Sequence, residues 1–361
     1  MKVLHIMNEL RFSGAEMMLS SGAPLLIPDG GAAILATGST VGEYAGHLER
    51  AGYKIFHIPF AKSPVFLAHV FKLARQGFDV VHIHTERASM EYALVCRLAG
   101  VRSLRTVHSE FLFDGRLRWQ RIFTRKVSRL LGVKQIACSD RVSRNEKVRF
   151  NNPMVVYDNW IDVSKIGGRG SAALRSQKRA ALGIAEHEIV AVAVGNEAPA
   201  KNLDSLVEAA ALLPEGLNLR IFHCGAVSAA LRDKAAALAG DRLCLLGSVG
   251  NVPDYLFASD IFVLPSLFEG GPLVLMEAAI AGLYCITTKV GIAEKLEGQG
   301  NIVFIEADPV SIAKALVYAA ELDPTERAAG ADSLSQYALS RFVPQVGARR
   351  YADTYRALAK A

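Results

Sequence analysis

The sequence predicts an α/β protein made of two doubly wound domains, each with a parallel sheet covered by helices. Short apolar runs alternate with helical segments along most of the 361 residues. This alternation is typical of parallel sheets, because each helix returns the chain to the start of the next strand. The length is enough for two domains of ordinary size. A content of 51% hydrophobic and 21% charged residues indicates a globular chain.

The first half of the chain predicts six strands, each followed by a helix. The strands are expected at residues 2–7, 32–36, 54–58, 79–84, 103–107 and 135–138. The helices are expected after Ser13, near 43–51, at 65–75, 88–98 and 116–134, and after Ser139. Ser13 and Glu16 have the spacing of a capping box, and Ser139 or Asp140 could cap the last of these helices.

The second half repeats the pattern after a glycine-rich segment. I-G-G-R-G-S at 166–171 predicts a linker, which gives domains at 1–165 and 172–340. Strands are expected at 189–194, 218–223, 243–246, 261–264 and 284–288. Helices are expected from Leu203, at 273–281, 311–322 and 325–339, and about 343–358.

The stretch from Asp260 to Glu277 combines features that suit a polar ligand. It reads D-I-F-V-L-P-S-L-F-E-G-G-P-L-V-L-M-E, a strand, a loop and the start of a helix. The two glycines let a ligand approach the backbone, and Pro272 suits the first helical position. The helix N-terminus can hold an anion, and a carboxylate can accept two hydroxyl hydrogen bonds. The plainer interpretation is a strand, a turn and a core helix with two solvated glutamates.

The same stretch resembles the donor-site motif of glycosyltransferase family 4, E-x7-E, written here F-E-G-G-P-L-V-L-M-E-A. The resemblance implies the GT-B architecture, with two Rossmann-like domains facing across a cleft and helix 343–361 crossing back onto the first. It implies that Glu269 contacts the transferred sugar and Glu277 the nucleotide ribose. The donor loop between them is Gly270, Gly271, Pro272 and Leu273.

Two further segments of the second domain resemble the donor site of this family. G-N-E-A-P-A-K-N at 195–202 is similar to the family's G-R-x4-K-G, whose Arg and Lys hold the donor diphosphate. Lys201 matches this pattern, but Asn196 stands where the Arg is expected, so a fixed guanidinium fork is lost. After the strand at 243–246, the segment from Gly247 to Val249 is expected to contact the base through its backbone.

Two histidines end predicted strands of the first domain, where ligands bind in doubly wound sheets. His108 in T-V-H-S resembles the family histidine that points at the sugar, and His84 in V-H-I-H-T is a second candidate. Either could also be an ordinary polar turn residue. The loop around Gly14 is expected, by the resemblance, to face the donor phosphates or the acceptor.

Positive charge is concentrated at residues 101–150, which hold 13 basic and 4 acidic side chains. The segment 116–134 predicts a basic amphipathic helix with an apolar stripe of Leu117, Ile122, Phe123, Val127, Leu130 and Leu131. One interpretation is a surface helix with a solvated basic face. Another is docking on an anionic membrane, with these residues at the surface: Arg118, Trp119, Arg121, Arg125 and Lys126. No nucleic-acid-binding motif is recognised.

The remaining features favour a cytoplasmic protein, with peripheral association at the inner face of the membrane. The five cysteines are dispersed, which indicates reduced core thiols. No C-x-x-C or H-E-x-x-H occurs, so neither a metal nor another cofactor is expected. No apolar run reaches the roughly 18 residues of a membrane helix, and the N-terminal run is too short for a signal peptide.

Together these features predict a glycosyltransferase, and the resemblance implies that it acts with retention. It would move a sugar from a nucleotide-diphosphate donor, UDP- or GDP-linked, to a glycan or lipid-linked acceptor. The resemblance places the reaction in lipopolysaccharide, exopolysaccharide or capsule assembly. Without a metal, Lys201 and backbone N–H groups would neutralise the leaving diphosphate. The alternatives are a non-catalytic scaffold on the same fold, and another reaction such as that of a nucleotide-sugar epimerase.

Overall fold

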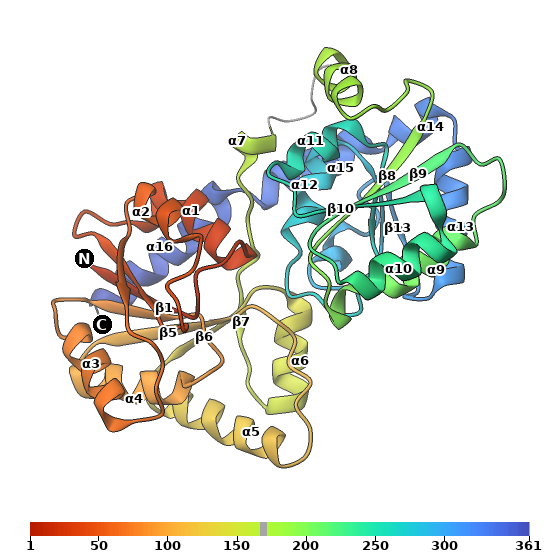
Figure 1. The fold of residues 1–361 in the computed structure, drawn as a ribbon. Coiled ribbons are helices and arrows are strands. Elements are labelled where there is room, and N and C mark those ends of the chain that lie inside the picture. The colour runs from red at the N-terminus through yellow and green to blue at the C-terminus, as the bar shows by residue number, and fades with distance from the viewer. Residues whose placement is uncertain (167–171, 361) are drawn as a thin grey trace. The chain divides into compact units, whose positions relative to one another are not determined.

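The computed structural model describes residues 1–166 and 172–360, which form two units (Figure 1). Residue contacts assign Met1–Asp162 and the segment from Phe342 onward to unit 1, and Val163–Arg341 to unit 2. The boundary lies three residues before the predicted one, because the short helix α7 (Val163–Ile166) belongs to unit 2. Apart from Ile166, the predicted linker at 166–171 lies outside the described residues.

Unit 1 is a doubly wound domain around a parallel sheet of seven strands, in the order β3-β2-β1-β4-β5-β6-β7. The strands are β1 (Val3–Met7), β2 (Ala32–Ala36), β3 (Lys54–His57), β4 (Val80–Ile83), β5 (Arg102–Val107), β6 (Lys134–Ala137) and β7 (Val155–Val156). The helices are α1 (Gly14–Leu26), α2 (Ala45–Arg50), α3 (Pro64–Ala74), α4 (Ser89–Ala99), α5 (Gly115–Leu130), α6 (Asp140–Phe150) and α16 (Pro344–Lys360). All six predicted strands are present.

The C-terminal helix α16 returns to unit 1 and packs against α1, as the sequence predicts. Trp160 fixes this arrangement: its Nε1 donates to the Met18 carbonyl of α1 at 3.1 Å, and its side chain is 2% exposed. A Cβ atom at Gly22 of α1 or Gly347 of α16 would lie 2.9 or 2.5 Å from the indole ring. Both helices therefore need glycine where they meet Trp160.

Unit 2 is built around a six-stranded parallel sheet in the order β10-β9-β8-β11-β12-β13. The strands are β8 (Ile189–Val194), β9 (Leu219–Cys224), β10 (Leu243–Gly247), β11 (Ile261–Leu264), β12 (Tyr284–Thr287) and β13 (Ile302–Phe304). The α-helices after α7 are α8 (Ala172–Ala181), α9 (Leu203–Ala211), α10 (Ala229–Leu238), α11 (Val252–Ala258), α12 (Leu273–Ala281), α13 (Pro309–Glu321), α14 (Pro324–Ala329) and α15 (Ala331–Arg341). The central strands β8 and β11 consist of apolar residues only, because helices cover both faces of the sheet.

Three local predictions about helix ends need correction. Ser13 starts α1, but its hydroxyl bonds the Glu16 carboxylate instead of a backbone N–H, so no capping box forms. Pro272 is the N-cap of α12 and Leu273 its first residue. The helix expected at 325–339 is divided into α14 and α15 at Gly330, whose N–H donates to the Asn301 side chain at 2.9 Å. The predicted cap at Ser139 is present, accepting from the Val142 N–H.

The largest correction concerns α5, whose apolar stripe does not face the core. Its buried residues are Thr124, Arg125 and Ser128, whereas Phe123 and Leu130 are 61% and 78% exposed. Arg125, which we expected at a membrane surface, is 1% exposed and forms a bidentate pair with the buried Glu146 carboxylate, both bonds at 2.7 Å.

The other expected surface cations of α5 also divide between interior and solvent. Glu86 pairs with Arg105, Arg121 and Arg125, and Arg118 donates to the Arg149 carbonyl at 3.0 Å. The carboxylates of the buried Glu146 and the half-buried Glu86 therefore determine which face of α5 turns inward, because an unpaired buried charge is costly. Trp119 and Lys126 remain exposed. Among the described helices, none is both long and apolar enough to cross a membrane.

Beneath α16, unit 1 has a polar core of histidine and hydroxyl side chains. His82 of β4 bonds the Tyr355 hydroxyl through Nδ1 at 2.7 Å and the Thr106 hydroxyl through Nε2 at 2.8 Å. The Thr106 hydroxyl also bonds Tyr351 at 3.1 Å. Burial lowers the pKa of His5, next to His82 in the sheet, to about 3, and that of His82 well below its usual value. Both rings are therefore neutral at pH 7.

This core predicts that acid destabilises unit 1. The pKa of His5 is lower in the folded than in the unfolded chain, so stability is present above the unfolded pKa of about 6.5 and is lost as pH falls towards 3. By pH 5, His5 alone should remove about 2 kcal/mol. Hydrogen exchange of β1 and β4 amides between pH 7 and 5 measures this, and His5→Phe should flatten the dependence. Equal protection at both pH values, after correction for intrinsic exchange, would contradict it.

Candidate functional site

The strand order of unit 2 reverses between β8 and β11, which lie side by side at the centre of the sheet. In doubly wound sheets, ligands bind beyond the carboxyl ends of the strands at this switch point. The segment 195–202 follows β8 and the segment 265–272 follows β11. The two predicted donor loops are therefore neighbours, and the Leu267 N–H donates to the Ala200 carbonyl at 2.8 Å.

Lys201 and Glu269 meet between these loops. The Lys201 Nζ lies 2.6 Å from Glu269 Oε1, and the Ser266 hydroxyl donates to the same oxygen at 3.0 Å. The two charged side chains are 28% and 13% exposed, so the pair is partly shielded from water. The arrangement can exchange partners: an anionic ligand could bind the ammonium while Glu269 accepts hydrogen bonds from hydroxyl groups.

Asn202 holds the two loops together, a role that sequence reasoning missed. Its Nδ2 donates to the Pro265 carbonyl at 3.1 Å and to the Ala307 carbonyl at 2.9 Å. Its φ of +55° is in the left-handed region, where asparagine is enriched among non-glycine residues. An asparagine directly before a helix was the available signal. Asn202 places the backbone that carries Lys201.

Asn196 connects the β8 loop to the loop after β9. Its Oδ1 accepts the Ala226 N–H at 2.9 Å, and the Glu197 N–H donates to the Ala226 carbonyl at 2.8 Å. A Cβ at Gly225 would lie 2.1 Å from the Gly195 carbonyl oxygen, so only glycine permits this approach. The residue that replaces the expected Arg therefore positions the loop, and the side chain itself brings no positive charge to the site.

The rest of the predicted donor segment surrounds the start of α12. A Cβ at Gly291 would lie 2.8 Å from Pro272 Cδ and 2.9 Å from the Gly270 carbonyl oxygen, so this turn packs closely on the donor loop. Gly271 and Leu273 are half-buried, and Glu277 lies half-buried in the second turn of α12. Gly247 is the last residue of β10 and Val249 lies just after it, two strands away from β8.

A surface hollow of about 720 Å³ lies beside this site, lined by Asn196, Asn202 and residues of the loop after β9. Its charged lining residues are Glu197 and Asp204, and neither Lys201 nor Glu269 belongs to it. Two carboxylates would repel a diphosphate. We therefore do not assign the hollow to the phosphate groups of a donor.

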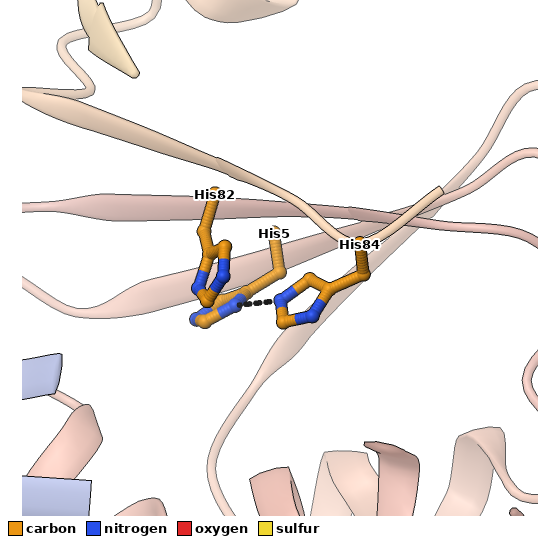
Figure 2. A group of neighbouring side chains, drawn as sticks. All are labelled: His5, His82 and His84. Atoms are coloured by element: carbon orange, nitrogen blue, oxygen red, sulfur yellow. Dashed lines mark hydrogen bonds between the residues drawn. The ribbon is translucent and has the colours of Figure 1, made fainter. Parts of the chain in front are cut away.

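Unit 1 has its own switch point, between β1 and β4, and the histidines gather there. His84 follows β4 and His108 follows β5, and a 3.0 Å hydrogen bond joins His84 Nδ1 to His108 Nε2. His84 Nε2 also lies 3.1 Å from His5 Nδ1 (Figure 2). The two predicted histidines are thus in contact. No sequence signal singled out His5, which is inside the buried strand β1. Gly14 begins α1 after the loop that follows β1.

His5, His82 and His84 place one ring nitrogen each within 4.8 Å of the others (Figure 2). Such a group has the donor type of a zinc site. Each of these rings is engaged in hydrogen bonds, however, and both nitrogens of His82 bond hydroxyl groups. Burial lowers the pKa of His108 to about 4 and the pKa of His84 well below its usual value. The rings are therefore neutral at pH 7.

Comparison with protein families identifies the chain. Residues 175–333 match the model described as Glycosyl transferases group 1, and residues 32–165 match the one described as Glycosyltransferase Family 4. The first match lies within unit 2 and nearly all of the second within unit 1. The chain belongs to the family 4 type of glycosyltransferases, and it is an enzyme with the GT-B fold.

Similar proteins act in bacterial glycan synthesis. The chain is 29% identical over 256 residues to UDP-Gal:alpha-D-GlcNAc-diphosphoundecaprenol alpha-1,3-galactosyltransferase of Escherichia coli, covering 65% of this chain and 64% of that relative. It is 24% identical over 293 residues to the capsular polysaccharide biosynthesis glycosyltransferase CapH of Staphylococcus aureus, covering 77% and 78%. The crystal structure of Anabaena HepE with UDP-glucose aligns with a TM-score of 0.81 at 19% identity, over 99% of this chain and 100% of that chain, which shows the shared fold.

The bridging role of Asn202 is testable by two substitutions. Asn202→Ala removes both hydrogen bonds and places a Cβ without a polar group in the left-handed region, so we expect a loss of about 2–4 kcal/mol. Asn202→Gly relieves the backbone cost and should lose about 1 kcal/mol less. Hydrogen exchange of β8 and β11 amides reports both. The control is Ser205→Ala, which removes only the bond to Asn202 Oδ1. Wild-type protection in Asn202→Ala would contradict the assignment.

Proposed function

We propose that the protein transfers a hexose, with retention, from a UDP-sugar to a lipid-linked glycan acceptor during the assembly of a bacterial surface polysaccharide. The observation that carries this proposal is the Lys201–Glu269 pair at the switch point, directly before the helix that holds Glu277. The printed names of the relatives support the choice of substrates. One uses UDP-Gal and a diphosphoundecaprenol-linked sugar, and HepE was crystallised with UDP-glucose.

The donor would bind by replacing one partner of the ion pair. The diphosphate takes the Lys201 ammonium, together with free N–H groups at the start of α12. Glu269, released from Lys201, accepts hydrogen bonds from the sugar hydroxyls, and Glu277 accepts those of the ribose. Because the groups are already placed and partly shielded, little reorganisation accompanies charge development on the leaving diphosphate.

In the transfer itself, the acceptor oxygen forms a bond to the anomeric carbon as the bond from that carbon to the diphosphate oxygen breaks. The acceptor proton passes to the diphosphate, and UDP leaves. Attack on the face of the leaving group retains the anomeric configuration. His108, on unit 1, would hydrogen-bond the substrate. Asn196 supplies no charge, so Lys201 is the side-chain cation that we assign to the diphosphate.

Two rival functions make different predictions. A nucleotide-sugar epimerase would bind the same donor but would need no acceptor, and the matches to two glycosyltransferase family models weigh against it. A non-catalytic scaffold is motivated by Asn196, because an expected phosphate-binding Arg is absent. It would show no turnover of any nucleotide sugar.

We assign the acceptor to a membrane surface because of the exposed face of α5. Trp119, Phe123 and Leu130 are 69%, 61% and 78% exposed on this helix, with Arg116 and Lys126 also exposed. Large apolar side chains beside cations suit the boundary between anionic headgroups and acyl chains. This face differs from the patch expected from sequence, because Arg125 is excluded from it and Phe123 and Leu130 are added.

Donor binding is tested by thermal unfolding with UDP, GDP and ADP. UDP at about 100 times its dissociation constant should add about 2.7 kcal/mol of stability. Lys201→Ala and Glu277→Ala should weaken this effect, because they remove the phosphate cation and the ribose acceptor. Glu215→Ala, at an exposed site outside the donor loops, is the matched control. Equal stabilisation by all three nucleotides would remove the case for a UDP-sugar, and none by any would favour the scaffold.

Membrane docking is tested by co-sedimentation with vesicles of phosphatidylglycerol or of phosphatidylcholine. We expect binding to the anionic vesicles alone, weakening as salt rises. The double substitution Trp119→Ser and Phe123→Ser should abolish it. Val148→Ser is the control, because Val148 is 77% exposed on α6, outside the proposed face. Trp160 is buried, so a fluorescence shift on binding would report Trp119. Equal binding by the double variant would contradict the assignment.

A further inference from the structure

Three imidazoles form a continuous hydrogen-bonded chain in unit 1, from the carboxyl edge of the sheet into its core. His108 Nε2 lies 3.0 Å from His84 Nδ1, and His84 Nε2 lies 3.1 Å from His5 Nδ1. His108 and His84 are partly exposed, whereas His5 is fully buried. Because both hydrogen bonds involve His84, this residue uses both of its ring nitrogens in the chain, whereas His108 uses one.

The neutral state of the rings gives the chain a direction. A neutral imidazole has one N–H donor and one acceptor nitrogen. If His84 accepts on one side, it must donate on the other, so the protons along the chain all point the same way. Burial lowers the pKa of each of the three rings, and the charge of Arg105 lowers that of His108 further. At pH 7 only two arrangements of the chain remain.

The buried end of the chain favours one of the two arrangements. His5 Nε2 has no hydrogen-bond partner and no contact with solvent. If the chain ran from His108 to His5, His5 would accept at Nδ1 and carry its proton on this isolated Nε2. The reverse direction leaves only a lone pair there, and buried N–H groups without a partner are rarer than unused acceptors. His5 therefore donates to His84, and His84 donates to His108.

This direction determines which nitrogen His108 offers to a ligand. Because His108 accepts at Nε2, its proton is on Nδ1, the ring nitrogen outside the chain. We propose that His84 and His5 are positioning residues that hold His108 as the Nδ1–H tautomer, so that His108 donates a hydrogen bond to a substrate oxygen and does not act as a base. The tautomer is independent of substrate, whereas its use in transfer rests on the function proposed above.

A metal site is the competing interpretation of the same cluster. Ligation by His5, His82 and His84 together would take one nitrogen each from His82 and His84, whose ring nitrogens all bond a hydroxyl or another imidazole. The described contacts of the three rings include no carboxylate to offset a divalent charge in this core. The hydrogen-bonded chain accounts for the observed distances without such a cost, so we favour it.

Nitrogen-15 NMR of protein labelled at histidine tests the proposal directly. The signals of His108 are assigned from the spectrum of His108→Gln. We expect wild-type His108 to be protonated on Nδ1 and unprotonated on Nε2. His84→Phe keeps a ring but cannot donate, so His108 should become a mixture of tautomers, and His5→Phe should shift it partly in the same direction. A wild-type His108 protonated on Nε2, or a tautomer unchanged in both variants, overturns the proposal.

His82→Gln is the matched control, because His82 lies in the same cluster but outside the chain. It should lower stability and leave the His108 tautomer unchanged. Circular dichroism establishes that each variant is folded, and His5→Phe keeps the test open if His84→Phe does not fold. Zinc titration decides the competing interpretation. Stoichiometric zinc binding that is lost in His5→Phe, His82→Gln and His84→Phe alike would overturn the proposed chain of hydrogen-bonded imidazoles.

Steady-state kinetics distinguish a failure of this proposal from a failure of the proposed function. With a UDP-sugar that is turned over, His84→Phe should lower kcat roughly 10- to 100-fold with little change in the donor KM, because a misplaced tautomer weakens an interaction made during transfer. Unchanged kcat despite a changed tautomer would overturn the role in transfer. Absence of turnover with every nucleotide sugar tested, with the tautomer as expected, would instead reject the proposed function.

Discussion

In a parallel sheet every strand ends at the same edge, and the rest of this structure depends on that constraint. Helical crossovers return the chain to the opposite edge, so each loop that follows a strand is placed beside the others. In unit 2 this brings together Lys201 and Glu269, which are 68 residues apart in the chain. In unit 1 it brings together His84 and His108. Neither pair could be formed by local structure alone.

Buried polar groups are paired in three different ways, two in unit 1 and one in unit 2. At the centre of unit 1, neutral imidazoles and hydroxyls satisfy one another beneath α16, so no charge is buried there. At the α4–α6 side, Arg125 instead pairs with Glu146 and Glu86, and full charges are retained. In the donor loops of unit 2, side-chain amides bond backbone groups: Asn196 and Asn202 connect loops that have no strand pairing to hold them. Each arrangement pairs most of the polar groups that it buries, and His5 Nε2 is an exception.

The departure from the family motif at Asn196 has a structural counterpart. An Arg at this position would offer a charged fork to phosphate, but it has no acceptor oxygen for the Ala226 N–H. The loop after β8 gains a fixed position, and in the proposed function the diphosphate relies on Lys201 and the start of α12. Lys201 in turn lies against Glu269, so that proposal couples donor binding to the release of this carboxylate. The same ion pair can therefore stabilise the empty site and select a ligand that has both phosphate and hydroxyl groups.

The amino-acid sequence by itself determined the fold class, the strands of both sheets except the edge strands β7 and β13, and most of the donor loop, because apolar periodicity and the E-x7-E spacing are local properties of the chain. The comparisons confirmed the fold and family, whereas the roles assigned to individual site residues stay predictions. Only the tertiary structure decided which side chains meet. It turned Arg125 inward, because Glu86 and Glu146 come from other segments, and left Phe123 exposed. It also revealed His5 and Asn202 as partners of the predicted residues, since their hydrogen bonds join segments that sequence spacing cannot relate.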